Sequence, residues 1–307
     1  MHLRILGSAA GGRFPQWNCG CENCAGVRKQ TFRGKARTQA QLALSDNGSS
    51  WFLAGACPDL AFQIESTPDL HPLARRDSPI AAVVLASADL DHILGLLLLR
   101  ELQSLRVYAT PSILRILREE NSMFGMLNRA DPQVIWTPIN PGSPFPLLDA
   151  VGKNLDLCCE AFPLGGRYPK YVRTKDLPPE HATSAVFFTA KSTTSKTDAR
   201  IGYLPAVGNL DDALLAKLDG LDVLLFDGTF WSDDELFRLD PTAERAHQMG
   251  HIPVEESLGL LKNTKIGRRI YIHINNTNPI LNESGLEHRA VRDAGWEIAE
   301  DNWYLEL

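Results

Sequence analysis

The sequence has no long apolar run and no excess of basic residues, and no signal peptide is visible in it. Its longest apolar stretch, at 93–99, is far too short to cross a bilayer, so we expect no membrane insertion. The N-terminus has neither an apolar core segment nor a small-residue cleavage site, so we predict a soluble cytoplasmic protein. A net charge of −6 over 307 residues gives no broad basic field, which argues against nucleic acid as a partner.

Cysteine is scarce, and three of the six cysteines fall within one short segment. Cys19, Cys21 and Cys24 form a C-x-C-x-x-C array, which is not a disulfide framework. Thiolates at this spacing can meet on one soft cation, usually tetrahedral zinc. We predict a structural zinc in a loop at 19–24, with a fourth ligand from the chain, a partner chain or water; a loop of free thiols is the alternative. The other cysteines are expected to be buried as small apolar residues: Cys57, Cys158 and Cys159.

Apolar strands alternate with helices, which predicts an α/β fold in a single domain over residues 1–307. The apolar run at 80–86 is typical of a strand buried on both faces. A hairpin is expected from 41–44 and 50–53, with its turn at 46–48. Further strands are expected at 2–6, 106–109, 133–136, 155–162, 185–189, 200–203, 223–227 and 269–274. Helices are expected at 91–102, 111–120, 210–218 and 253–262, and a surface loop or lid at 165–179.

Metal-capable residues follow the buried strand in the segment S-A-D-L-D-H. Side chains at the carboxyl end of such a strand converge where active sites of α/β proteins form. Asp89 and Asp91 lie next to an apolar core, where a carboxylate without a partner is costly. Helix capping by Ser87 or Asp89 is an equally acceptable interpretation of this segment taken alone.

Two distant strand ends favour a common site. Asp227 ends the run V-L-L-F-D, and His273 ends R-I-Y-I-H. His251, in a Gly-His pair before a helix, is predicted to be a proton donor or a ligand, and His247 a substrate-facing residue or one without a role. The remaining histidines are expected at the surface: His2, His71, His181 and His288.

The order of these motifs resembles the metallo-β-lactamase superfamily, and the finer pattern is similar to the protein B family of pyrroloquinoline quinone (PQQ) biosynthesis. The matching phrases are G-S-A-A-G-G, W-N-C-G-C-E-N-C, D-L-D-H-I-L-G-L, F-D-G-T-F-W, G-H-I-P-V and H-I-N-N-T-N-P. They run from the N-terminus to about Asn282. The resemblance implies an αβ/βα sandwich of two mixed sheets flanked by helices.

One motif departs from the superfamily. The signature H-x-H-x-D-H reads S-A-D-L-D-H here, so Ser87 and Asp89 replace two histidines of the first zinc site. The resemblance implies that the active-site ion is held by Asp91, His92, His273 and a bridging Asp227. It also implies that Asp89 would lie near the ion as a catalytic residue or ligand, and that His251 would be the proton donor. Two histidines with a carboxylate are typical of non-haem iron oxygenases.

The resemblance implies a hydroxylase step in PQQ biosynthesis. Iron(II) and O₂ would oxidise the tyrosine ring of a crosslinked Glu–Tyr precursor, with manganese(II) or zinc able to occupy the site. The alternatives are a metal-dependent hydrolase, and a carrier or transport factor for PQQ or its precursor. A homodimer is a further expectation. Substrate carboxylates are expected to meet Lys170, Tyr171 and Arg173, unless these form only a solvated loop.

Overall fold

The computed structural model describes residues 1–129, 133–191 and 198–307, and the chain separates into two compact units. Unit 1 comprises Met1–Leu6, Gln41–Ala199 and Asn302–Leu307. Unit 2 comprises Gly7–Ala40 and Arg200–Asp301. The single domain over the whole chain stays a prediction.

Unit 1 contains a mixed sheet whose strand order is β14-β1-β2-β3-β4-β5-β6. Strands β3 to β6 are parallel, whereas β2 pairs with β3, and β1 with β14, in antiparallel fashion. The buried strand β4 keeps the apolar run predicted for it. The bounds are β1 His2–Gly7, β2 Gln41–Ser45, β3 Trp51–Ala54, β4 Ile80–Val84, β5 Leu105–Ala109, β6 Val134–Pro138 and β14 Trp303–Glu306.

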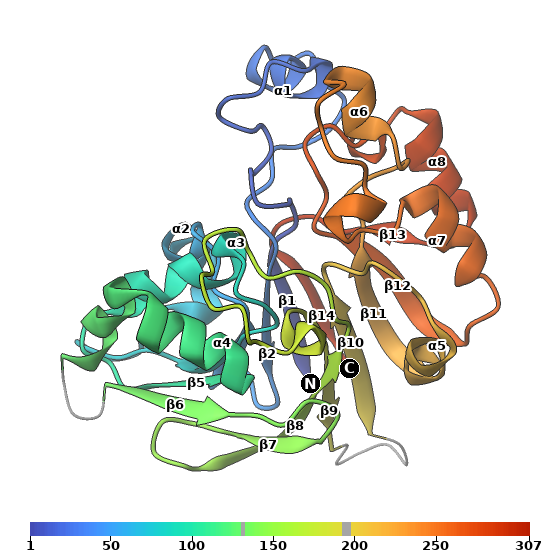
Figure 1. Cartoon of the computed structure of the whole chain (residues 1–307). Helices are drawn as coiled ribbons and strands as arrows, with labels where there is room; N and C mark the ends of the chain where they lie inside the picture. The colour runs from blue at the N-terminus through green and yellow to red at the C-terminus, as the bar shows by residue number, and fades with distance from the viewer. Residues whose placement is uncertain (130–132, 192–197) are drawn as a thin grey trace. The chain divides into compact units, whose positions relative to one another are not determined.

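Short helices of unit 1 lie together on one side of strands β5 and β6 (Figure 1). They are α2 Leu60–Glu65, α3 Leu90–Ile93 and α4 Pro111–Arg115. The helix predicted at 91–102 is wrong beyond its first turn, because the chain continues as a 3₁₀ helix over Leu94–Leu99. There Gly95 approaches the loop that follows β3, and its N–H donates to the carbonyl oxygen of Ala56 at 2.8 Å. The helix predicted at 111–120 ends at Arg115 and continues as a π-helical turn.

The second sheet comprises antiparallel strands in unit 1 and parallel strands in unit 2. In unit 1, β8 pairs with β7 and β9. In unit 2, β10 to β13 are parallel, and Asp227 at the end of β11 lies opposite Ile272 at the end of β12. The bounds are β7 Phe145–Leu148, β8 Asn154–Pro163, β9 Ser184–Ala190, β10 Ala199–Leu204, β11 Leu221–Asp227, β12 Ile266–Ile272 and β13 Glu297–Ile298.

Helices of unit 2 flank its strands, with α7 and α8 on the same side of β11 and β12 (Figure 1). Their bounds are α1 Glu22–Arg28, α5 Asp212–Leu218, α6 Glu235–Leu239, α7 Val254–Leu260 and α8 Leu286–Asp293. The predicted fold class, two mixed sheets flanked by helices, is confirmed. Within the described residues, no helix is long and apolar enough to cross a membrane.

The cysteines and histidines outside the candidate site follow the predictions in most cases. Cys57 and Cys159 are buried, whereas Cys158 is only partly buried. The four histidines predicted at the surface are all partly exposed.

Candidate functional site

The three clustered cysteines of unit 2 lie where the N-terminal loop enters α1. Cys21 is the residue before this helix, and Cys24 lies inside it and is buried. The three sulfur atoms lie within 4.8 Å of one another, as ligands of one ion would. The predicted array therefore converges in space.

A fourth polar group reaches this cysteine cluster from a distant part of unit 2. The side-chain amide of Asn276 lies 3.2 Å from the sulfur of Cys19, 3.7 Å from that of Cys21 and 3.4 Å from that of Cys24. Asn276 is 3% exposed. Sequence reasoning missed this residue, although it stands in the phrase H-I-N-N-T-N-P.

The cysteine thiols have divergent acidities. Burial, and then the neighbouring Cys21 and Cys19, raise the pKa of Cys24 to about 12. Burial also acts on Cys19, but hydrogen bonds from Cys21, Cys24 and Asn276 outweigh it and lower the pKa of Cys19. A cation bound by all three sulfurs must therefore displace protons, as zinc does in cysteine sites.

Asp227 is the most heavily bonded carboxylate of the strand-end site. It is fully buried, and its Oδ1 accepts hydrogen bonds from the backbone N–H and the hydroxyl of Thr229, at 3.0 and 2.7 Å. Its Oδ2 accepts from Val207 N, at 2.9 Å, and from Nδ1 of His251, at 2.8 Å. These four donors use about all the lone-pair directions of a carboxylate. An ion bound by Asp227 would have to replace one of them.

His251 lies beside Asp227 and His273. Gly250 precedes it with a φ of 84°, a left-handed conformation that glycine adopts readily. The His251 ring stacks on that of His273, with the ring centroids 5.7 Å apart. Ligand atoms of Asp227, His251 and His273 lie within 4.8 Å of one another. Unit 2 thus presents two imidazoles and a carboxylate as one donor set.

His273 follows β12 with a φ of 59°, which is unusual for a residue other than glycine. Such strain persists only where the surrounding structure holds it, and it is concentrated at functional sites. The hydroxyl of Thr229 lies 2.9 Å from Nδ1 of His273 and 3.0 Å from its carbonyl oxygen. Thr229 therefore connects Asp227 to His273, a role that sequence reasoning missed.

In unit 1 the segment S-A-D-L-D-H forms a second hydrogen-bonded group. Asp89 occupies the N-cap position of α3, as the capping interpretation allows, but its side chain makes no cap hydrogen bond. Its Oδ2 accepts instead from the hydroxyl of Ser87 at 2.8 Å, and Ser87 Oγ lies 2.8 Å from Nδ1 of the buried His92. Asp91 lies in the first turn of α3. The prediction that Asp91 and His92 share an ion with Asp227 and His273 stays a prediction.

The basic loop predicted as a lid is anchored in unit 1 by Tyr171. The Tyr171 hydroxyl donates to the carbonyl oxygen of Ala88, and its partly buried ring packs against the core. Burial raises the pKa of Tyr171. Lys170 and Arg173 are exposed, and the backbone N–H of Arg173 donates to Glu120 at 2.9 Å. Substrate binding by the loop stays a prediction.

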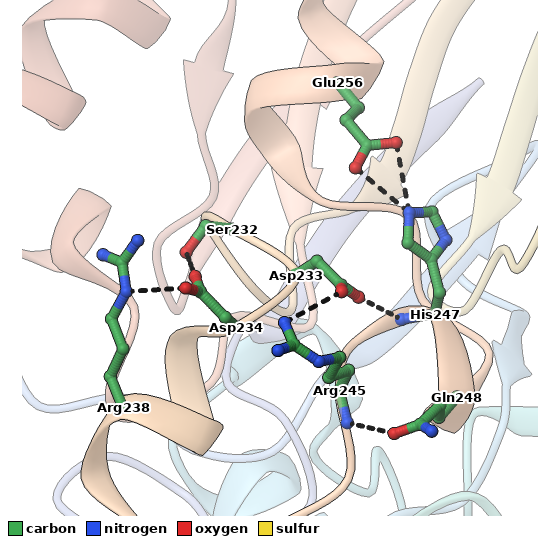
Figure 2. Close-up of polar contacts among 8 residues, drawn as sticks. All are labelled: Ser232, Asp233, Asp234, Arg238, Arg245, His247, Gln248 and Glu256. Atoms are coloured by element: carbon green, nitrogen blue, oxygen red, sulfur yellow. Dashed lines mark hydrogen bonds and ion pairs between the residues drawn. The ribbon is translucent and has the colours of Figure 1, made fainter.

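His247 is held by acidic residues of unit 2 (Figure 2). Its Nε2 lies 3.0 Å from a carboxylate oxygen of Glu256 on α7, and its backbone N–H donates to Asp233 at 3.0 Å. Asp233 also forms an ion pair with Arg245. These contacts give His247 a structural role, and its contact with substrate stays a prediction.

Glu235 connects the segments that follow Asp227 and His273. The carboxylate is buried at the start of α6 and accepts from Trp231 N at 2.6 Å and from the Thr277 hydroxyl at 2.5 Å. Burial raises the pKa of Glu235 to about 7. Sequence reasoning did not single out this residue.

Comparisons with known proteins agree with this fold and with the motifs. The Beta-lactamase superfamily domain matches residues 50–274. Proteins named Coenzyme PQQ synthesis protein B from Klebsiella pneumoniae (strain 342) and Acinetobacter baylyi are 38% and 36% identical to the chain. Both alignments cover 100% of this chain, and they cover 98% and 100% of the two relatives. The chain belongs to the coenzyme PQQ synthesis protein B family.

Two solved structures have folds similar to that of this chain. Zn²⁺-bound PqqB from Methylobacterium extorquens matches with a TM-score of 0.90 and 36% identity, and the match covers 100% of both chains. A diphosphatase of the PhnP family matches with a TM-score of 0.70 at 18% identity, covering 100% of this chain and 96% of that one. The second likeness concerns the fold alone.

Proposed function

We propose that this protein is a metal-dependent enzyme of PQQ biosynthesis, and that it hydroxylates the tyrosine ring of a crosslinked Glu–Tyr precursor with iron(II) and O₂. The observation that carries the proposal is the cluster of Asp227, His251 and His273 in a member of this family, because it brings together two of the proposed ligands and the proposed proton donor. Imidazole and carboxylate ligands fit iron(II), and they also accept manganese(II) or zinc.

The proposed ligands of the active-site ion are Asp91, His92 and His273, with Asp227 as a fourth or bridging ligand and Asp89 beside them. This assignment is supported by the strand-end positions and by the family resemblance. When bound, iron(II) supplies the redox chemistry that lets O₂ react with the ring. Each hydroxylation converts one ring C–H bond to C–OH and reduces the second oxygen atom to water, with two electrons and two protons from an external reductant.

His251 is proposed to exchange protons with the substrate. Asp227 accepts from Nδ1 of His251, which keeps a proton on that nitrogen and orients the ring. Nε2 is then the atom through which His251 gives or takes a proton. Lys170, Tyr171 and Arg173 are proposed to bind the carboxylates of the precursor.

The test is anaerobic loading of the full chain with iron(II), followed by addition of the Glu–Tyr fragment, ascorbate and O₂. We expect an oxygen-dependent gain of one or more oxygen atoms in the fragment, measured by mass spectrometry. His251→Ala should lower the rate and keep the iron content. His71→Ala, which changes a partly exposed histidine of unit 1, should behave as wild type.

Other outcomes would overturn the proposal. Cleavage of the fragment by the zinc-loaded protein without O₂ would identify a hydrolase. Binding of the fragment without turnover under any metal would identify a carrier. Wild-type iron binding in both Asp91→Ala and His273→Ala would show that the ligands are wrongly assigned.

A structural zinc at the cysteine cluster is a separate proposal, with Asn276 as its fourth ligand. The two ends of a carboxamide are similar in size, so a half-turn of the Asn276 amide places Oδ1 where Nδ2 now lies, beside all three sulfurs. The set then has the four ligands of a closed structural zinc site.

Metal analysis of purified variants tests the zinc site. Cys21→Ser and Asn276→Ala should both lower zinc affinity, and Asn276→Asp should retain a ligand oxygen and restore it. Asn275→Ala is the matched control, because the Asn275 side chain bonds Thr277 instead. Fully folded wild-type protein without zinc after gentle purification would contradict the site. Wild-type affinity in Asn276→Ala would exclude the fourth ligand.

A further inference from the structure

The two units contain the same kind of hydrogen-bonded chain, in which a hydroxyl connects a carboxylate to a histidine. In unit 2, the threonine relay consists of Asp227, Thr229 and His273, with the Thr229 hydroxyl 2.7 Å from Oδ1 of Asp227 and 2.9 Å from Nδ1 of His273. Acid and hydroxyl are two residues apart in sequence, and the histidine comes from the next strand end.

In unit 1, the serine relay consists of Asp89, Ser87 and His92. The Ser87 hydroxyl lies 2.8 Å from Oδ2 of Asp89 and 2.8 Å from Nδ1 of His92. Acid and hydroxyl are again two residues apart, but in the opposite order along the chain. The two units therefore reach the same arrangement from different local sequences.

The number of available protons determines which group donates each hydrogen bond in the two relays. A hydroxyl has one proton to donate, and an ionised carboxylate can only accept. At 2.7 Å the oxygens of Thr229 and Asp227 need that proton between them, so the hydroxyl donates to Asp227 rather than to the more distant carbonyl oxygen of His273. The hydroxyl oxygen then accepts from Nδ1–H of the imidazole. In the serine relay, the Ser87 hydroxyl likewise donates to Asp89 and accepts from Nδ1–H of His92. Ser87 Oγ also accepts from the backbone N–H of Asp89 at 3.2 Å.

Most residues of the two relays are buried, which strengthens the hydrogen bonds between them. Asp227 is 0% exposed, and Thr229, His273, Ser87 and His92 are 3%, 7%, 1% and 6% exposed. In a medium of low dielectric constant these hydrogen bonds are strong, and losing one leaves a costly unpaired group. The left-handed backbone of His273 adds a second constraint on the position of its ring.

We infer that Thr229 and Ser87 are positioning residues that hold His273 and His92 as the Nδ1–H tautomer and orient the lone pair of each Nε2 toward a metal ion. The inference rests on the proposed function, because it assigns the ligand atom of two proposed ligands. Outer hydrogen bonds of this type orient metal-binding histidines and raise their basicity. Ser87, which replaces a histidine of the superfamily signature, thereby serves the histidine that remains.

The test measures the tautomers directly. Full-length protein with ¹⁵N-labelled histidine, freed of the active-site ion, is studied by long-range ¹H–¹⁵N correlation at about pH 8, where an ordinary histidine is neutral. His92→Gln and His273→Gln assign the two signals. We expect Nδ1–H for both histidines in the wild type. Thr229→Ser should preserve this state for His273, whereas the isosteric Thr229→Val should populate the Nε2–H tautomer.

Zinc titration of the same samples gives a second measurement. Thr229→Val should weaken zinc at the active site by about 10- to 100-fold, and Thr229→Ser should restore the affinity. Ser87→Ala and Ser87→Thr repeat the comparison for His92. An Nε2–H tautomer in the wild type, or an unchanged tautomer in folded Thr229→Val, would overturn the inference. Should Thr229→Val fail to fold, the wild-type tautomer alone decides. Expected tautomers in a protein that binds no active-site ion would support the tautomer assignment, and would overturn the proposed function together with the orientation of each Nε2 toward a metal ion.

Discussion

Replacing Glu235 by glutamine should stabilise the protein above neutral pH and leave it unchanged in acid. The buried carboxyl has a pKa of about 7, against an ordinary value of 4.5. Below pH 4.5 both the folded and the unfolded chain carry the proton. As pH rises from about 4.5 to about 7, the unfolded chain releases it first, so the free energy of unfolding falls. Above about pH 7 the penalty is complete.

The size of this penalty follows from how far burial raises the pKa of Glu235. A tenfold change in an acid dissociation constant corresponds to about 1.4 kcal/mol, so burial of the charge costs about 3 kcal/mol above neutral pH. Glutamine has nearly the same shape and can accept from Trp231 N through Oε1. Its amide nitrogen can donate to the Thr277 hydroxyl, which rotates to accept. The polar contacts of the site are therefore kept while the charge is removed.

Urea unfolding at several pH values measures this effect. The difference in free energy of unfolding between Glu235→Gln and wild type should rise from about zero near pH 4.5 to about 3 kcal/mol near pH 8. Glu255→Gln removes the charge of an exposed carboxylate on α7 and should show no such trend. A difference that is constant over this range, or that falls with pH, would refute the assignment of a buried charge to Glu235.

Three further outcomes are expected. Gly95→Ala should destabilise the protein by about 1–3 kcal/mol or more, because a Cβ there would overlap the carbonyl oxygen of Cys57. Gly125→Ala, also in a 3₁₀ helix but with open space, is its control in urea unfolding, and equal stabilities would contradict the packing argument. Zinc affinity of the cysteine cluster, measured with a chromophoric chelator, should fall with falling pH because binding displaces thiol protons; an affinity independent of pH would argue against thiolate ligands. The double change Lys170→Gln and Arg173→Gln should weaken precursor binding in calorimetry, most clearly at low salt, whereas Lys153→Gln should not, and unchanged affinity would leave the loop without a binding role.

Much of the fold could be predicted because its strands are continuous apolar runs. The run at 80–86 became β4, and the run that ends at Asp227 became β11. The prediction of a regular helix at 91–102 was wrong after its first turn, although the local apolar pattern suits such a helix. The close approach of Gly95 to the loop that follows β3 accompanies a 3₁₀ helix over Leu94–Leu99 instead. Helix α1 was missed because a short helix beside three cysteines has no periodic pattern of its own.

The candidate site was predictable only where one residue carries its own signal. An aspartate or histidine at the tip of an apolar strand is costly without a function, so Asp227 and His273 could be singled out. Thr229 and Asn276 are common residues in loops, and their importance depends on which atoms the fold brings beside them. Nothing in the sequence alone connects Asn276 with a cysteine array more than two hundred residues earlier.

The left-handed backbone at His273 has a consequence for engineering. An ordinary side chain in this conformation costs about 1–2 kcal/mol, a cost that glycine avoids. Replacing His273 by glycine would relieve this strain, but it would also remove a buried imidazole that stacks on His251 and is hydrogen-bonded to Thr229. The lost packing and the lost hydrogen bond offset the relief of strain, so libraries built to stabilise this protein should hold position 273 constant.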